Sequence, residues 1–110
     1  MHFIDDGYTF KIVKDSKMVG GIAVFKNNND VYTLGSIFIK PAYQNKGLGQ
    51  KVILLIEEKY PDAKKWVLET PYLNFRNHHL YEKMEYVKAG EYFPDKNSDF
   101  KLFMYEKIIK

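Results

Sequence analysis

Hydrophobic and polar residues alternate along the first third of the chain, with the two-residue period that is typical of β-strands. Three segments rich in β-branched and aromatic residues, at 8–13, 18–25 and 31–39, therefore predict three strands. Turn-forming residues separate them, with Asp15-Ser16-Lys17 in the first connection and consecutive asparagines in the second, at 26–30. We expect the chain to open as an antiparallel meander.

The period changes to that of a helix after Pro41, which ends the third predicted strand. A helix is predicted at 47–60 because apolar residues fall on one face, at Leu48, Val52, Leu55 and Ile56. Pro61 ends this helix, since a proline cannot continue the helical hydrogen bonds. A short loop at 42–46 thus joins a strand to the start of a helix.

The rest of the chain predicts a second helix and three more strands. Asn74 is a suitable N-cap for the helix, because its side chain can accept a hydrogen bond from the first turn. The helix is expected at 75–84 and the strands at 65–70, 86–92 and 100–108. The order β-β-β-α-β-α-β-β describes one α/β (α+β) domain, residues 1–110, with a mixed, mostly antiparallel sheet.

Composition narrows the class of protein. The 110 residues suffice for one domain, and contents of 45% hydrophobic and 16% aromatic residues exclude a disordered chain. No apolar run reaches the roughly 18 residues of a membrane span, and the N-terminus lacks the pattern of a secretory signal. The absence of cysteine fits the reducing cytoplasm and excludes thiol chemistry and cysteine-based zinc sites.

The net charge of +3 comes from lysines scattered among acidic residues, and Arg76 is the only arginine. Nucleic-acid binding typically uses clustered basic residues and several arginines. We therefore expect no nucleic-acid or membrane partner. The mild basicity is that of an ordinary surface, and at most it helps to attract an anionic ligand such as a nucleotide.

The sharpest motif is Gln44-x-x-Gly47-x-Gly49, which lies between a predicted strand and a predicted helix. Glycine lets a ligand approach the backbone closely, and the N–H groups at a helix start favour a pyrophosphate. Lys46 adds a full positive charge. The motif is neither the dinucleotide fingerprint nor a P-loop. Alone, it is equally compatible with a glycine-rich helix start that binds nothing.

The segment from Ile37 to Gly49 resembles the acetyl-CoA motif of the GNAT superfamily of N-acetyltransferases, which combines an apolar strand, a proline and Gln/Arg-x-x-Gly-x-Gly/Ala. A second segment resembles the family's downstream signature, because a strand at 66–70 is followed by Asn74 and, seven residues later, by Tyr81-Glu82-Lys83. The two segments together make the resemblance specific.

One position departs from the family pattern, because Glu85 stands where a glycine usually follows the helix. That position is often left-handed, and a residue with a side chain costs about 1 kcal/mol or more there. The departure concerns the geometry of the turn and leaves the cofactor motif intact.

The resemblance implies a GNAT-like acyl-CoA N-acyltransferase fold, with acetyl-CoA as co-substrate and no metal. It implies that Asn74 bonds the pantetheine arm and that Tyr81 lies near the thioester sulfur, where its phenol can act as general acid to the thiolate. From the residues alone, the alternatives are that Asn74 only caps the helix and that Tyr81 is an aromatic residue of the core. The implied CoA-binding residues are Ile37, Phe38, Ile39, Gln44, Asn45, Lys46, Gly47, Leu48, Gly49, Gln50, Asn74, Asn77 and Tyr81.

The acceptor half of the site is marked less clearly. An amine with a pKa near ~10.4 must lose its proton before it attacks, so a general base is expected. Glu69 is the best candidate among the acids, and a plain surface carboxylate is the alternative. The resemblance implies a backbone donor for the oxyanion, for which we choose the Phe38 N–H. Tyr32 and Ser36 could bind the acceptor or a water.

Other polar residues predict no chemistry. His78 and His79 point about 100° apart on a helix and do not converge on a metal, so we interpret them as solvated or packing residues. Glu57 and Glu58 are expected on a solvated helix face.

Members of the family usually begin with a strand and helices that build the acceptor pocket, and the resemblance implies that this chain lacks them. The open sheet edge and face would need cover, so a homodimer or another partner is expected. The predicted function is transfer of an acetyl group from acetyl-CoA to a primary amine. A CoA-binding module without catalysis and a small interaction domain are the alternatives, and the acceptor stays open.

Overall fold

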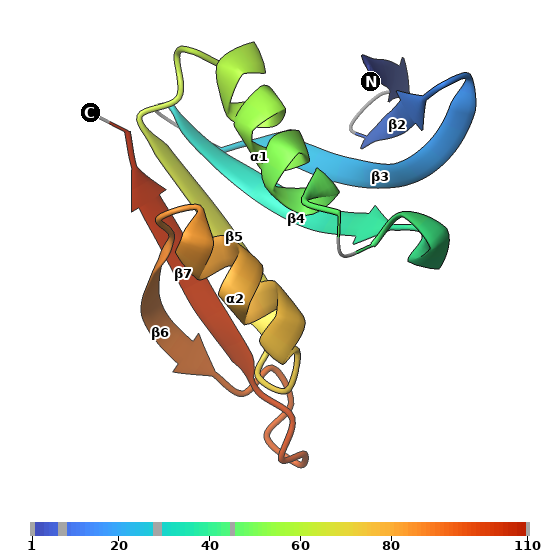
Figure 1. Cartoon of the computed structure of the whole chain (residues 1–110). Coiled ribbons are helices and arrows are strands. Elements are labelled where there is room, and N and C mark those ends of the chain that lie inside the picture. The colour runs from blue at the N-terminus through green and yellow to red at the C-terminus, as the bar shows by residue number, and fades with distance from the viewer. Residues whose placement is uncertain (1, 7–8, 28–29, 45, 110) are drawn as a thin grey trace.

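The computed structural model of the protein describes residues 2–6, 9–27, 30–44 and 46–109. These residues form one seven-stranded sheet with two α-helices (Figure 1). The strands are β1 (His2–Asp6), β2 (Thr9–Lys14), β3 (Lys17–Lys26), β4 (Val31–Ile39), β5 (Lys65–Pro71), β6 (Val87–Tyr92) and β7 (Leu102–Ile108). The helices are α1 (Leu48–Lys59) and α2 (Phe75–Lys83), and a 3-10 turn, η1 (Pro41–Tyr43), follows β4.

The strand order in the sheet is β1-β2-β3-β4-β5-β7-β6. Every neighbouring pair is antiparallel except β4 and β5, which are parallel and connected through α1. Figure 1 shows α1 in front of β3 and β4, and α2 in front of β5 and β7. Both helices therefore cover the same face of the sheet, as right-handed crossovers require.

The structure confirms the predicted fold class and most of the predicted elements. The hairpin turn between β2 and β3 has positive φ at Asp15 and Ser16, as its tight reversal requires. The expectation that the chain lacks an N-terminal strand is wrong, because His2–Asp6 forms β1 and pairs antiparallel with β2. Only residues 7–8 connect these strands, so no helix lies between them.

The core lies between the sheet and the two helices. Trp66, Leu34 and Leu68 from the sheet are fully buried against Ile53 and Ile56 of α1. Alternation along the strands places these side chains on one face, while their sequence neighbours point to the other face. We call this other face, which α1 and α2 do not cover, the open face.

Two aromatic rings of the open face lie across glycines of neighbouring strands. The Phe38 ring occupies the space that a side chain at Gly21 would need, and the Phe25 ring does the same at Gly35. The exposed fractions of Phe38 and Phe25 are 54% and 42%. This part of the sheet therefore presents flat aromatic surface to the outside.

β4 and β5 are paired only at their beginnings. Parallel pairing joins residues 31–33 to residues 65–67, and the later parts of the two strands are not paired with each other. Gly35 has no partner in the β3–β4 register and forms a bulge. This bulge comes two residues after Thr33, the last residue of β4 that pairs with β5. Because bulges bend the strand that carries them, β4 diverges from β5 beyond this point. The divergence positions the site described below.

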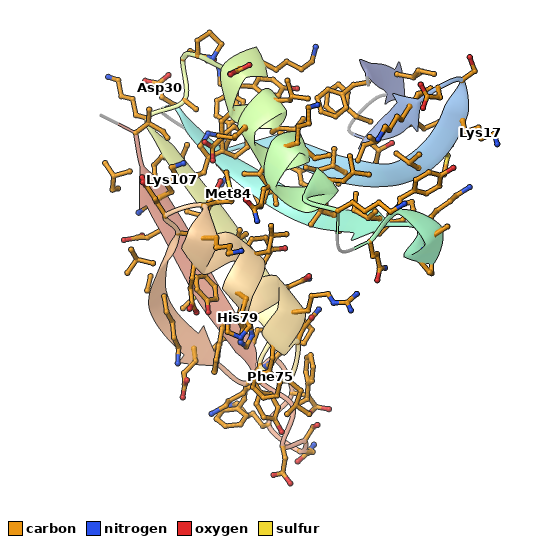
Figure 2. The ribbon with its side chains drawn as sticks, viewed as in Figure 1. Lys17, Asp30, Phe75, His79, Met84 and Lys107 are labelled. Carbon is orange, nitrogen blue, oxygen red and sulfur yellow. The ribbon has the colours of Figure 1, made fainter. Side chains whose placement is uncertain are left out.

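The prediction that Glu57 lies on a solvated helix face is wrong, whereas Glu58 is exposed as expected. The Glu57 carboxylate accepts hydrogen bonds from the Tyr86 hydroxyl and the Lys107 ammonium, both at 2.9 Å. The side chains of Glu57 and Lys107 are only 12% and 16% exposed. Figure 2 labels Lys107 on β7. Glu57 thus connects α1 to the C-terminal strands.

The turn after α2 keeps the left-handed geometry that the family pattern implies. Glu85 has φ 71°, although it is not a glycine. The Tyr86 N–H donates to the Tyr81 carbonyl at 2.9 Å, and the Glu85 N–H donates to the Glu82 carbonyl at 3.0 Å. These bonds satisfy the last carbonyls of α2 and hold the turn despite the cost of the side chain.

Candidate active site

Gly47 begins α1 in a left-handed conformation, with φ 75°. No side chain caps this helix start, and its first turn carries no acidic residue. An added side chain at Gly47 would meet no atom within 4 Å, so its backbone angle, and not a lack of space, is what requires glycine. The N–H groups of Leu48, Gly49 and Gln50 come before the first helical hydrogen bond, and the positive potential of a helix start favours an anion there.

Gly49 serves a different purpose, the close packing of the two helices. A side chain added there would approach the methyl groups of Leu80 on α2 to 3.1 Å. The two glycines of the motif therefore have separate roles, one for the turn and one for the approach of α2 to the start of α1.

Gln44 links the loop before α1 to both sides of the site. Its side-chain amide donates to the Ile39 carbonyl at 2.8 Å. Its side-chain oxygen accepts a hydrogen bond from the Arg76 guanidinium on α2. Asn45 lies outside the described residues, and Lys46 is exposed and does not line the cleft described next.

A cleft of about 600 Å³ lies between β4, the start of α1 and α2. It brings together ten of the predicted CoA-binding residues, namely Ile37, Phe38, Ile39, Gln44, Gly47, Leu48, Gly49, Gln50, Asn74 and Asn77. The structure adds five residues that sequence reasoning missed, Tyr43, Arg76, His79, Leu80 and Lys83. None of the lining residues in the described part of the chain is acidic, so the cleft suits an anionic ligand.

The basic side chains of the cleft come from α2. Arg76, His79 and Lys83 follow one another at intervals of three and four residues, which places them along one side of the helix. Figure 2 labels His79 on α2. The helical spacing was visible in the sequence, but only the packing of α2 beside the phosphate loop turns these residues toward a common space.

The backbone of β4 turns alternate N–H groups toward the cleft. The Lys40 N–H donates to the Val19 carbonyl on β3, and the register Gly20↔Ile39, Gly21↔Phe38 continues from there. Because the bonds of an antiparallel ladder alternate, the Phe38 N–H points to β3 and the N–H groups of Ile37 and Ile39 point away from it. The choice of the Phe38 N–H as oxyanion donor is therefore wrong. The cleft-facing donors are those of Ile37 and Ile39.

Asn74 caps α2 and lines the cleft. Its side-chain oxygen accepts from the Asn77 N–H at 3.3 Å, which fits the local interpretation of a helix cap. Its position in the wall of the cleft keeps its side-chain amide available to a ligand. The structure therefore confirms the helix cap, and the bond of Asn74 to the pantetheine arm stays a prediction.

The chain also matches a known protein family. The acetyltransferase (GNAT) family matches residues 2–86. The chain belongs to the GNAT acetyltransferase family. A comparison with curated proteins finds no match.

Solved structures of this family share the fold. A Bacillus anthracis acetyltransferase in complex with acetyl coenzyme A is similar with a TM-score of 0.83 at 21% identity, over 93% of this chain and 63% of that chain. A Bacillus subtilis acetyltransferase in complex with CoA gives 0.80 at 16% identity, over 93% and 76%. The ribosomal-protein-S18-alanine N-acetyltransferase from Escherichia coli gives 0.78 at 20% identity, over 97% and 69%. This GNAT chain thus spans about two thirds of the length of its structural relatives.

Tyr81 is placed less openly than the resemblance implies. Its side chain is 3% exposed, and it does not line the cleft, although its neighbour Leu80 does. The ring lies between the rings of Tyr86 and Tyr105, with centroids 6.1 Å and 6.0 Å away. Burial raises the pKa of Tyr81 to about 12. The phenol is therefore protonated at neutral pH. Because no hydrogen bond to its hydroxyl occurs among the described residues, the hydroxyl can donate to a ligand.

Glu69 lies on the open face, where its side chain is exposed. It comes two residues after Val67, the last residue of β5 that pairs with β4, so it stands where β4 and β5 diverge. Its carboxylate accepts a hydrogen bond from the Tyr92 hydroxyl at 2.9 Å. Ser36 is also exposed on the open face. The acid and the cleft thus lie on either side of the opening between the strands.

Tyr32 does not reach the site. It is 4% exposed, packs against Trp66 with ring centroids 5.2 Å apart, and donates its hydroxyl to Asp62 at 2.7 Å. The hydrogen bond to Asp62 and burial raise its pKa to about 12. The prediction that Tyr32 could bind an acceptor is therefore wrong, because this residue faces the core.

The side chains of His78 and His79 point in different directions, as expected for adjacent residues of a helix. His78 is buried, stacks on Phe103 at 5.0 Å between ring centroids, and contacts the Pro71 carbonyl through Nε2 at 3.1 Å. His79 is exposed and lines the cleft. Among the described residues, no group of three or more His, Cys, Asp or Glu could hold a metal ion. No helix in the described ranges is long and apolar enough to cross a membrane.

Proposed function

We propose that this protein transfers the acetyl group of acetyl-CoA to a primary amine. One observation carries the proposal: a left-handed glycine, an uncapped helix start and the part of β4 that β5 leaves unpaired line a single cleft, and none of its described lining residues is acidic. The relatives crystallised with CoA and with acetyl coenzyme A support this ligand. Family membership supports the reaction.

The cofactor would lie along the cleft with its phosphates at the start of α1. The N–H groups of Leu48, Gly49 and Gln50 would bind the pyrophosphate, as helix starts commonly do. Arg76 and Lys83 would neutralise the remaining phosphate charge from the side of α2. The pantetheine arm would then run along β4, with its amides bonded to the Ile39 backbone and the Asn74 side chain.

The reaction needs three groups around the thioester. The amine nitrogen attacks the thioester carbonyl carbon, and the new C–N bond replaces the C–S bond when the tetrahedral intermediate collapses. The Ile37 N–H, deeper in the opening than Ile39, would donate to the oxyanion. Glu69, alone or through a water, would take the amine proton, and Tyr81 would protonate the CoA thiolate. The raised pKa of Tyr81, about 12, keeps the phenol protonated at neutral pH, so it can donate a hydrogen bond to the thiolate as the thiolate forms.

Calorimetry with CoA and a thiol-release assay across an amine panel test the proposal. The panel would contain a polyamine, an aminoglycoside, free amino acids and peptides with free N-termini. Tyr81→Phe should lower kcat by ten- to a hundredfold and leave the CoA Kd unchanged. Tyr105→Phe is the matched control, because its ring packs beside that of Tyr81 while its hydroxyl is bonded to Glu82. Failure of the protein to bind CoA would contradict the proposed function.

A second function has one observation in its favour. Neither Tyr81 nor Glu69 lines the cleft, whereas the groups that would bind the cofactor do. A CoA-binding module without catalysis would have this arrangement. Tight CoA binding without thiol release from any amine of the panel would favour it.

The proposal includes a second copy of the chain as partner. The exposed Phe25 and Phe38 rings form an apolar surface over β3 and β4 that the helices of this chain leave bare. A dimer through this surface would leave Glu69, on β5, accessible. Light scattering at micromolar concentration should give the mass of a dimer, and Phe25→Glu should give that of a monomer. A monomeric wild type would contradict this partner.

A further inference from the structure

A tyrosine on the edge strand β6 donates a hydrogen bond to Glu69, the candidate base. The Tyr92 hydroxyl on β6 donates to Oε2 of Glu69 on β5 at 2.9 Å. β7 lies between these strands, so the tyrosine reaches across a whole strand. The bond therefore depends on the sheet and cannot form within a local segment of the chain.

The register explains how Tyr92 can span this distance. Glu69, Met104 and Gly90 form one row across the three strands, and Pro71, Leu102 and Tyr92 form the next row. All six positions face the same side, because they differ by two residues along each strand. The terminal methyl of Met104 lies over Gly90, at 2.8 Å from where a side chain there would begin. The absence of a side chain at Gly90 thus lets the Met104 side chain lean toward β6.

The pair stands on the acceptor side of the proposed reaction. Pairing between β4 and β5 ends at Val67, so Glu69 is the next residue of β5 on the open face. The cofactor cleft lies on the helix side of the same opening. An amine that meets the thioester from the open face would therefore pass Glu69.

We propose that Tyr92 is a positioning residue, which fixes Oε2 of Glu69 and leaves Oε1 to accept the proton of the amine. This inference rests on the proposed function. An exposed glutamate samples several rotamers, and a hydrogen bond to one oxygen restricts them to those that keep the other oxygen in place. The hydrogen bond to Glu69 also raises the pKa of Tyr92, so the hydroxyl keeps its proton at neutral pH and acts only as a donor.

A double-mutant cycle on the full chain tests this role with the best amine of the panel. Tyr92→Phe should lower kcat about five- to tenfold and leave the KM for acetyl-CoA unchanged. In a Glu69→Gln background the same change should have no further effect, because the base is already gone. Tyr72→Phe, a half-buried tyrosine that packs on Phe103, is the control and should keep the wild-type rate.

The outcomes separate the inference from the proposed function. Additive effects of the two substitutions, or a wild-type rate for Tyr92→Phe, would overturn the positioning role while the enzyme stays active. A wild type that binds CoA but acetylates no amine would overturn both. NMR titration of ¹³C-labelled tyrosine gives a readout that needs no acceptor: the pKa of Tyr92 should fall in Glu69→Gln. An unchanged value would show that the hydrogen bond does not form, and the inference would fail.

Discussion

The Arg76 guanidinium donates a hydrogen bond to the side-chain oxygen of Gln44, and so connects α2 to the loop before α1 across the mouth of the cleft. The Gln44 amide is fixed in turn on the Ile39 carbonyl. The single arginine of the chain is therefore placed beside the helix start that would receive a pyrophosphate.

Arg76→Gln should weaken CoA binding about tenfold, because a charge-assisted bond to a phosphate is lost. Calorimetry at low and high salt checks this, and the difference from wild type should shrink as salt rises. Lys96→Gln, on the exposed turn between β6 and β7, removes the same charge outside the cleft and should change the Kd little. Equal losses for the two variants would indicate a general charge effect and contradict the contact.

Removal of the Glu57 carboxylate should destabilise the fold. Glu57→Ala leaves the Lys107 ammonium and the Tyr86 hydroxyl partly buried without their partner, at a cost of about 2–4 kcal/mol in the free energy of unfolding. Urea denaturation measures this cost. Glu58→Ala, at the exposed neighbour, should stay within about 0.5 kcal/mol of wild type. A similar small effect at both positions would refute the structural role of Glu57.

Glu85→Gly should stabilise the protein by up to about 1 kcal/mol. The residue has φ 71°, and glycine removes the steric cost of that angle at a smaller loss of chain entropy. The same substitution at Glu58, in regular helical geometry, should instead cost about 1 kcal/mol. Thermal and urea unfolding of the two variants should therefore move in opposite directions. Destabilisation by Glu85→Gly would mean that the turn is not left-handed.

Stability should fall at alkaline pH. Burial raises the pKa of Tyr81 from 10.0 to about 12 in the folded protein. A raised pKa contributes stability that is complete below the unfolded value and is lost as pH rises from about 10 to about 12. The difference corresponds to about 2–3 kcal/mol, and Tyr81→Phe should flatten the pH dependence between these limits. Denaturation measured from pH 8 to 11.5 checks this, and a curve of unchanged slope in the variant would contradict the shift.

Much of the cofactor half of the site could be predicted from the sequence. Gly47 and Gly49 mark a turn and a close approach by their lack of a side chain, and such requirements are local. Asn74 is likewise predictable as the start of a helix. Glu69 could be picked out as a candidate acid, but its hydrogen bond from Tyr92 could not be predicted, because the two residues are 23 positions apart and joined only through the sheet.

Local sequence patterns gave wrong predictions for polar residues whose role depends on burial. Glu57 belongs to an ordinary helical pattern, and only the packing of α1 against β7 makes it a buried partner of Lys107. Tyr32 carries a hydroxyl on a strand near the site, yet the pleat turns it toward Asp62 and the core. The short strand β1 was missed because it gains its hydrogen bonds only from β2.

The sequence by itself determined most of the elements, the family and the glycine-rich loop before α1, because periodicity and glycine positions act over a few residues. Only the tertiary structure decided which groups share a space. The divergence of β4 from β5 opens the cleft, the packing of α2 adds Arg76 to it, and the antiparallel ladder turns the Ile37 and Ile39 N–H groups inward. These relationships join residues far apart in the chain, and their geometry is fixed by the sheet as a whole.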